Sequence, residues 1–226
     1  MDKNIVVFCA HSDDEAVGIG GLLSKFIEEK YNIIKVVFTY GESSQPHFKK
    51  SVIIKKRLKE TKKASEYLGI KEDICLGLSD TNLSEIFKSM FKKDQKKEIK
   101  SKMNKKIKNQ VKKIIQKYNP DKIFIPGSND PHPDHQTVNK TILDVVDQMD
   151  KKYSVYEFEV WNFKKEEKPE IYYDITPYYK KKINYMKMFV SQWQYMYALW
   201  LPVWFRSRMY GRKINVKFAE KVYRVR

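Results

Sequence analysis

The chain has 226 residues, which is enough to bury a full hydrophobic core, and we expect a single domain over residues 1–226. Hydrophobic residues make up 42% and charged residues 32% of the sequence, which is the balance of a soluble globular protein. The 45 Lys and Arg against 28 Asp and Glu give a formal net charge of +17. This charge favours an anionic partner such as nucleic acid, a membrane surface or a phosphorylated substrate, although lysines spread along the whole chain also fit simple solvation of the surface.

A polar cluster lies on the turn between the first expected strand and the first expected helix. The apolar run at residues 5–8 predicts a short buried strand, and hydrophobic residues at helical spacing from residue 22 predict the helix. The turn between them carries His11, Asp13, Asp14 and Glu15. Three acids at a helix start also suit the helix dipole, but a cap needs only one acid and does not use a histidine. Because open α/β sheets bind ligands at such turns, we favour a site.

Further strands and helices alternate along the middle of the chain. We expect strands at residues 33–39, 73–76 and 122–126, and helices at residues 50–67 and in the later part of the lysine-rich segment 83–118. In that later part the apolar side chains expected to face inward are Met103, Ile107, Val111, Ile114 and Ile115. This pattern favours a solvated amphipathic helix over a nucleic-acid-binding face. The alternation predicts a Rossmann-like α/β fold, a mostly parallel sheet with helices on both faces.

A second polar cluster follows the expected strand at residues 122–126. Its titratable side chains are Asp130, His132, Asp134 and His135. A helix over residues 136–150, strands at 155–163 and 171–175, and a helix starting near Thr176 and Pro177 complete the expected elements.

Together the two clusters predict a metal site. Three of the four histidines and four aspartates lie in these two loops, and zinc held by two histidines and a carboxylate keeps one position open for water. Bound zinc lowers the pKa of that water towards about 7, and a nearby carboxylate that does not bind the metal can act as a general base. Their spacing favours His11 and Asp14 on one metal, with Asp13 pointing elsewhere.

The same residues resemble a known family. Ala-His-Ser-Asp-Asp-Glu at residues 10–15 and Pro-His-Pro-Asp-His at residues 131–135 resemble the AHPDDE and HPDH motifs of the PIG-L (LmbE-like) deacetylases. Those zinc-dependent enzymes, amidohydrolases acting on linear amides, remove acetyl groups from N-acetylglucosaminyl compounds. Other segments follow in family order: Thr39 to Glu42, Arg57 and Glu60 with residues 68–70, residues 156–161, residues 174–176, and Ser191 with Gln192. Ser12 stands where the motif has proline.

The resemblance implies a role for each residue of the two motifs. His11, Asp14 and His135 would bind Zn²⁺, with another divalent metal such as Fe²⁺ left open. Asp13 would take a proton from the attacking water and pass it to the leaving amine. Protonated His132 would stabilise the oxyanion, with Asp134 hydrogen-bonded to it. Arg57 would contact the sugar or its attached group. Asp130, where several bacterial members carry tyrosine, is expected beside the substrate.

An aromatic segment near the C-terminus, residues 189–210, stays open to several interpretations. Residues 189–205 contain no charged side chain, but the run is short and too polar for a spanning helix. We favour a helix and loop packed on the domain or forming a pocket wall. The alternative is an interfacial patch, in which Arg206, Arg208, Arg212 and Lys213 face anionic lipid. The segment is also a candidate interface between copies of the chain.

The leading functional hypothesis is a metal-dependent deacetylase of an N-acetylglucosamine-type sugar or glycoconjugate. The first alternative is a deacetylase whose substrate is a lipid-linked or phosphorylated glucosaminide at a membrane surface. The second is an inactive deacetylase fold that binds nucleic acid, which we disfavour because no RNP, zinc-finger or GXXG motif is present.

The cysteines and the N-terminus bear on the compartment. Cys9 and Cys75 fall in or at the end of expected buried strands without a CxxC spacing, so we expect reduced core thiols. The N-terminus lacks the apolar core of a signal peptide. Both features predict a cytoplasmic protein, with peripheral membrane association as the alternative.

Overall fold

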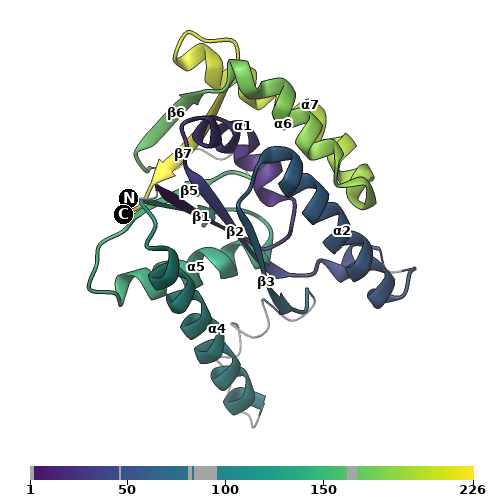
Figure 1. Ribbon diagram of the computed structural model, residues 1–226, viewed down its shortest axis with the longest axis vertical. Coiled ribbons are helices and arrows are strands. Elements are labelled where there is room, and N and C mark those ends of the chain that lie inside the picture. The colour runs from purple at the N-terminus through teal and green to yellow at the C-terminus, as the bar shows by residue number, and fades with distance from the viewer. Residues whose placement is uncertain (1–2, 46, 81–82, 84–95, 162–166) are drawn as a thin grey trace.

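The strands of the computed structural model form one sheet, which is shown in Figure 1. The structure describes residues 3–45, 47–80, 83, 96–161 and 167–226. Within these residues the sheet has seven strands in the order β3-β2-β1-β4-β5-β7-β6. Their bounds are β1 Asn4–Cys9, β2 Asn32–Thr39, β3 Glu72–Leu78, β4 Lys122–Pro126, β5 Ser154–Phe158, β6 Glu170–Asp174 and β7 Ala219–Arg224. Strands β1 to β5 are parallel to one another, and β7 runs antiparallel to β5 and β6. The predicted mostly parallel α/β sheet is confirmed.

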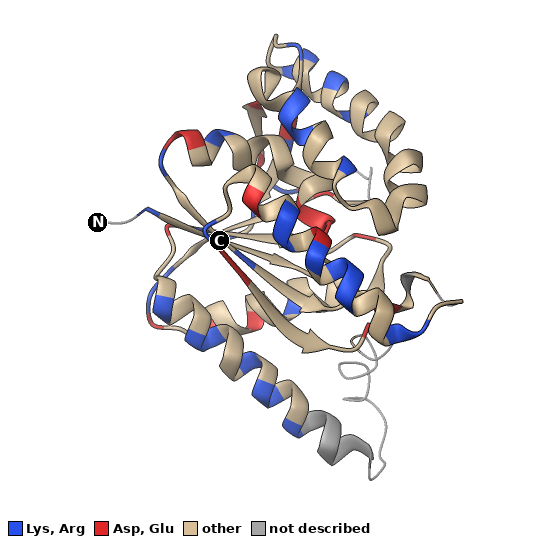
Figure 2. Ribbon diagram, turned by 45° about the vertical axis from the view of Figure 1, so that its right-hand side comes forward, with Lys and Arg blue, Asp and Glu red and all other residues tan. Residues whose placement is uncertain are grey.

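Helices cover both faces of this sheet, as predicted (Figure 1). One face, here called the α1 face, packs against α1 (Asp14–Glu28), α2 (Lys50–Leu68), α6 (Tyr179–Lys187) and α7 (Trp193–Lys213). The other, here called the α4 face, packs against α4 (Lys96–Tyr118) and α5 (Pro133–Asp147). Short 3₁₀ turns occur at Glu42–Ser44, Thr176–Tyr178 and Val190–Gln192. Figure 2 shows Lys and Arg spread over helices of both faces, with a row along α4.

Helix α1 is broken in its middle, and side chains from the C-terminal elements complete its hydrogen bonding. Ile19 has non-helical backbone angles (φ −137°, ψ 23°). The carboxylate of Glu220 accepts hydrogen bonds from the backbone N–H groups of Gly21 (3.1 Å) and Leu22 (2.6 Å). The carbonyl of Val17 accepts from Lys182 Nζ at 2.8 Å and from Arg206 at 3.2 Å. These contacts supply partners for backbone groups at the break.

Glycine is required in α1 because the helix lies very close to its neighbours. A Cβ atom on Gly18 would overlap the ring of Phe158, and one on Gly21 would lie 2.8 Å from Ile175. The helix that begins at the first polar cluster is therefore pressed against the end of β5 and the segment that precedes α6.

Several expectations differ from the structure. Strand β7 was not predicted. The strand expected at 155–163 ends at Phe158, and its last two positions lie outside the described residues, as do residues 84–95 of the lysine-rich segment. Met103 is 36% exposed, because it lies off the inward stripe formed by Ile107, Val111 and Ile115. Cys75 is exposed rather than a core thiol, because it lines a surface groove between α2 and the edge strand β3.

Candidate active site

The two polar clusters meet at the carboxyl ends of neighbouring strands. Strand β1 pairs with β2 on one side and with β4 on the other. The chain moves outwards from β1 to β3 and then crosses back to β4, so the strand order reverses between β1 and β4. Ligands bind at such switch points in open α/β sheets. The turn after β1 carries His11 and Asp13 and leads into α1 at Asp14, and the loop after β4 carries Asp130 and His132 and leads into the first turn of α5, which holds Asp134 and His135.

His11, Asp14 and His135 form a group whose ligand atoms all lie within 4.8 Å of one another. Asp14 Oδ1 lies 3.1 Å from His135 Nε2 and 3.5 Å from His11 Nδ1. The other oxygen, Oδ2, accepts hydrogen bonds from the backbone N–H groups of Ala10 (2.8 Å) and His11 (2.9 Å). The turn thus fixes one oxygen and aims the other at two imidazoles. Two nitrogens and one carboxylate oxygen are a ligand set that suits zinc.

The charges in this group are set by close contact. Burial raises the pKa of Asp14, but His135 and His11 outweigh it and hold that pKa well below its usual range. Burial lowers the pKa of His135, but Asp14 and Asp130 outweigh it and raise the pKa to about 9. Asp14 is therefore ionised at neutral pH, as ligation requires, whereas His135 must release a proton before it binds a metal.

Asp130 lies behind His135 rather than on the wall of the pocket. Its side chain is 0% exposed, and Oδ1 is 2.8 Å from His135 Nδ1. The carboxylate also accepts from the backbone N–H groups of His132 (2.9 Å) and Trp161 (3.0 Å). We expected Asp130 beside the substrate, but its position is that of a carboxylate that orients a metal-binding histidine.

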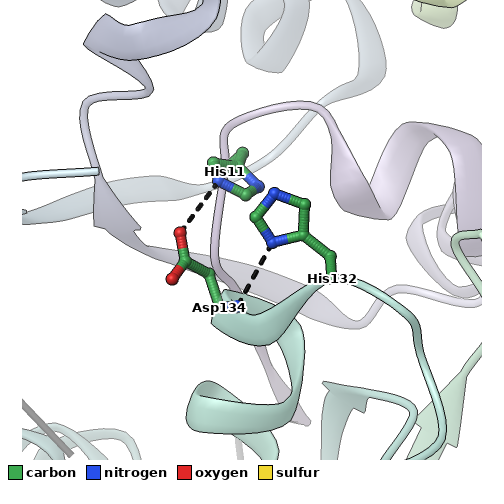
Figure 3. Close-up of side chains that lie close together, drawn as sticks. All are labelled: His11, His132 and Asp134. Carbon is green, nitrogen blue, oxygen red and sulfur yellow. Dashed lines mark hydrogen bonds and ion pairs between the residues drawn. The ribbon is translucent and has the colours of Figure 1, made fainter. Parts of the chain in front are cut away.

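His132 and Asp134 complete a second group with His11 (Figure 3). His132 is the N-cap of α5, and its Nδ1 accepts a hydrogen bond from the backbone N–H of Asp134 at 3.2 Å. The Asp134 carboxylate lies 3.6 Å from His11 Nε2 instead. Burial and the neighbouring imidazoles lower the pKa of His132. These contacts favour a neutral His132 over the imidazolium expected from the resemblance.

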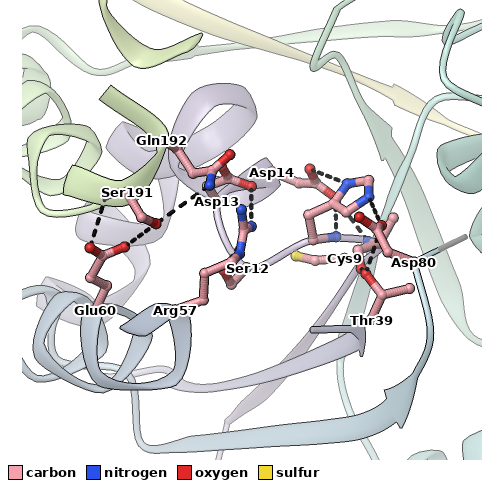
Figure 4. Close-up of polar contacts among 12 residues, drawn as sticks. Cys9, Ser12, Asp13, Asp14, Thr39, Arg57, Glu60, Asp80, Ser191 and Gln192 are labelled. Carbon is pink, nitrogen blue, oxygen red and sulfur yellow. Dashed lines mark hydrogen bonds and ion pairs between the residues drawn. The ribbon is translucent and has the colours of Figure 1, made fainter. Parts of the chain in front are cut away.

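Asp13 and Arg57 form a charged pair at the mouth of the site (Figure 4). Asp13 is the N-cap residue of α1, but its side chain makes no capping hydrogen bond. Its Oδ1 lies 3.5 Å from Arg57 Nη2, which also donates to Ser12 Oγ at 3.2 Å. Gly41 leaves room for the guanidinium, because a Cβ there would lie 2.6 Å from Arg57 Cζ and the backbone has φ +65°. Both Asp13 and Arg57 line the pocket.

Asp80 is a site residue that the sequence analysis missed. It follows β3, and its Oδ1 lies 2.9 Å from His11 Nε2. Oδ2 accepts from the backbone N–H of Ser43 at 3.2 Å. A single acid in a loop gave little signal, although its place after a third parallel strand puts it at the same edge of the sheet.

The pocket above these residues has a volume of about 270 Å³ and is closed on one side by α7. From α7 the lining residues are Tyr195, Met196 and Leu199, and Gln192 just before the helix and Trp161 after β5 extend this wall. Glu60 fixes the start of this wall, since its carboxylate accepts from the backbone N–H of Ser191 at 2.9 Å and from its hydroxyl at 2.5 Å (Figure 4). Helix α2 is therefore linked to the site at two positions one turn apart. Arg57 contacts Asp13, and Glu60 contacts the start of the aromatic segment.

Known structures share this fold. The N,N′-diacetylchitobiose deacetylase from Pyrococcus horikoshii superposes with a TM-score of 0.80 at 21% identity, covering 99% of this chain and 84% of that one. GalB, the 4-carboxy-2-hydroxymuconate hydratase from Pseudomonas putida KT2440, gives 0.76 at 19% identity, with 99% and 96% covered. A zinc-inhibited form of teicoplanin deacetylase gives 0.77 at 12% identity, with 98% and 97% covered.

The family comparison covers both polar clusters. Residues 6–146, more than half of the chain, match the family described as PIG-L, GlcNAc-PI de-N-acetylase. The match begins in β1 and ends in α5, so it includes every member of the two groups centred on His11. The chain therefore belongs to the PIG-L (LmbE-like) family.

Proposed function

We propose that this protein is a metal-dependent N-deacetylase that removes the acetyl group from an N-acetylglucosamine-type sugar or glycoconjugate. The observation that carries the proposal is the meeting of His11, Asp14 and the buried His135 beside a pocket that His11, Asp13 and Asp14 line. The family match supports it, as do structural relatives described as deacetylases of diacetylchitobiose and teicoplanin. The hydratase GalB shares the fold, so the proposal depends on the residues of the site.

His11, Asp14 and His135 would hold the metal, with Zn²⁺ as the first candidate. When bound, the ion supplies Lewis-acid chemistry and favours a hydroxide nucleophile at neutral pH. Asp130 is the positioning residue for His135, because its buried carboxylate fixes the orientation of the imidazole and supports Nε2 as the ligand atom.

Asp13 is the proposed general base. Its carboxylate lines the pocket and is not engaged in capping α1, so it is available to take a proton from the attacking water. The water oxygen forms a bond to the acetyl carbon, the C–N bond breaks, and Asp13 returns the proton to the departing amine nitrogen. Arg57, 3.5 Å from Asp13, fixes the position of the carboxylate.

His132 is the proposed donor to the oxyanion. Because Nδ1 accepts from the backbone of Asp134, the proton of the neutral ring lies on Nε2, which can donate to the oxygen of the acetyl group. Asp134 lies 3.6 Å from His11 Nε2, and its carboxylate favours the charged form of both His11 and His132.

Acetate release tests the proposal directly. We expect release from N-acetylglucosamine, chitobiose, nucleotide-linked or lipid-linked substrates by metal-loaded protein, and loss of release after chelation. Asp13→Asn should lower kcat by about 10²- to 10⁴-fold without loss of bound metal. Asp150→Asn, at an exposed position in the turn after α5, is the matched control. Equal release by the wild type and Asp13→Asn would remove Asp13 as the base, and absence of release across the panel with metal bound would overturn the deacetylase proposal.

A further inference from the structure

The outer face of α7 exposes large apolar side chains along four consecutive turns. Tyr197 is 80% exposed, Phe205 61%, Trp193 60% and Leu201 59%, and Trp200 and Trp204 are also exposed. Their spacing places them on the side of the helix opposite Met196, Leu199 and Val203, which are buried against the α1 face. Contiguous apolar surface of this kind marks an interaction site in a protein that is otherwise well solvated.

A groove runs beside this face. It has a volume of about 710 Å³ and lies between α6 and α7, lined among others by Ile183, Phe189, Trp193, Met196 and Trp200. Met196 also lines the candidate active site. The active-site pocket and the groove are therefore separated by the first turns of α7, and a surface that covers the outer face of α7 lies next to the mouth of the pocket.

The charged side chains in the stretch of chain that carries the patch all have one sign. No acidic residue occurs between Asp174 and Glu220. The basic side chains of this stretch are Lys180, Lys181, Lys182, Lys187, Arg206, Arg208, Arg212, Lys213 and Lys217. Lys182 and Arg206 are buried and bind the carbonyl of Val17, so Arg206 does not face lipid as the interfacial alternative had it. Lys180, Lys187, Arg212, Lys213 and Lys217 are exposed.

We propose that the outer face of α7 docks onto an anionic membrane surface, with the helix lying in the plane of the interface. Tryptophan and tyrosine favour the headgroup layer, where an apolar ring and a polar tip are both accommodated. Exposed cations at both ends of the patch pair with anionic headgroups. In a contact between two copies the same cations would face one another, so charge favours the membrane. Among the described residues, no helix is both long enough and apolar enough to cross a bilayer.

Vesicle flotation tests this proposal without any enzyme assay. The full chain is mixed with vesicles of phosphatidylcholine alone or of phosphatidylcholine with phosphatidylglycerol, at low and at high salt. We expect flotation with the anionic vesicles and a weaker bound fraction at high salt. Trp193, Trp200 and Trp204, of the four tryptophans in the chain, provide an independent signal, since their emission should shift to shorter wavelength only when anionic vesicles are present.

Paired variants locate the contact. Leu201→Glu with Phe205→Glu should lower the vesicle-bound fraction by about tenfold or more, because neither side chain can then enter the interface. These two residues do not line the active-site pocket, and thermal unfolding checks that the variant folds. The matched control is Met103→Glu, an exposed apolar position on α4 at the opposite face of the sheet, and it should float like the wild type.

Three results would overturn the proposal. The first is no flotation with anionic vesicles at low salt. The second is flotation that survives in the α7 variant and is lost in a Lys112→Glu, Lys113→Glu variant of α4, which would assign binding to the lysine row of that helix. The third is a stable dimer of the wild type in sedimentation, combined with no binding of the wild type to vesicles and a monomeric α7 variant.

Discussion

The two faces of the sheet are stabilised in different ways. On the α4 face the core consists mainly of Val, Ile and Phe side chains, and the ion pair between α4 and α5, Lys108 with Asp144, lies at the surface. On the α1 face two ion pairs have both side chains at most 3% exposed: Glu15 with Lys35, and Glu220 with Lys182. The α1 face also carries Asp13 and Asp14. Helix α5 on the α4 face begins with His132, Asp134 and His135, so each face presents part of the site. We infer that apolar packing is nearly enough to hold α5, whereas the broken helix α1 is fixed by directional polar contacts.

The largest expected effect comes from removing Glu220. Glu220→Ala should lower the free energy of unfolding by about 3–5 kcal/mol, because it leaves Lys182 as an unpaired buried charge and removes the acceptor of two backbone N–H groups in α1. Urea unfolding measures this loss. Glu220→Gln is the control that keeps a carbonyl acceptor, so it should destabilise less. A loss below about 1 kcal/mol for the alanine variant would contradict the contrast between the faces.

Asp130→Asn should act on metal affinity rather than on the fold. We expect a 10- to 100-fold weaker affinity, about 1.4–2.8 kcal/mol, since the amide no longer orients His135 as a charged acceptor. Competition with a chelator measures the affinity, and unfolding of the metal-free protein should change little. Unchanged affinity would show that the 2.8 Å contact to His135 is not used in ligation.

A small cavity on the α4 face should lower stability moderately and leave metal binding unchanged. Ile142→Val removes one buried methylene from α5 and should lower the free energy of unfolding by about 0.5–1.5 kcal/mol. Metal stoichiometry and chelator competition should match the wild type. If this variant weakened metal binding as much as Asp130→Asn, the apolar packing of α5 and the orientation of His135 would not be separable.

The smallest effect is expected for an exposed ion pair. Asp147 and Arg226 are 2.7 Å apart and nearly half exposed, so Asp147→Asn should change stability by less than about 1 kcal/mol. The hydrogen bond with Arg226 lowers the pKa of Asp147. The stabilisation is therefore present above the unfolded pKa of about 3.9 and is lost as the pH falls through the lower folded value. Urea unfolding at neutral and at strongly acidic pH checks the sign, and a difference that grows on acidification would contradict it.

Sequence alone predicted the features that arise locally. The strands that precede the two clusters and the helices that follow them have clear apolar patterns, and the rule for carboxyl ends of parallel strands brought His11 and His135 together. Strand β7 was missed because its sequence does not look like that of a central strand. It lies between β5 and β6, yet it carries the charged residues Glu220 and Lys221, which are buried. Their partners come from distant elements, so a short charged segment gave no sign of burial.

The same physical reason explains the other missed assignments. Glu15 was expected as an acid at the helix start, but it is buried with Lys35 and accepts from Tyr185 at 2.5 Å. Arg206 follows an aromatic run, and the interfacial alternative placed it against lipid, but it binds the carbonyls of Val17 and Val160. In each case a charge is buried because of a partner far along the chain, which hydrophobic periodicity does not detect.

The break in α1 has a consequence for the order in which the protein matures during synthesis. The contacts that Glu220 makes with Gly21 and Leu22 join positions separated by 199 and 198 residues. Domains generally form from the N-terminal side as the ribosome proceeds, yet this helix receives its last hydrogen bonds from a strand made about two hundred residues later. A nascent chain that has already exposed His11, Asp14 and His135 still lacks the strand that supports α1, the helix that begins with Asp14. We therefore expect ribosome-bound chains stalled before residue 220 to retain metal poorly, however much of the sheet they have formed.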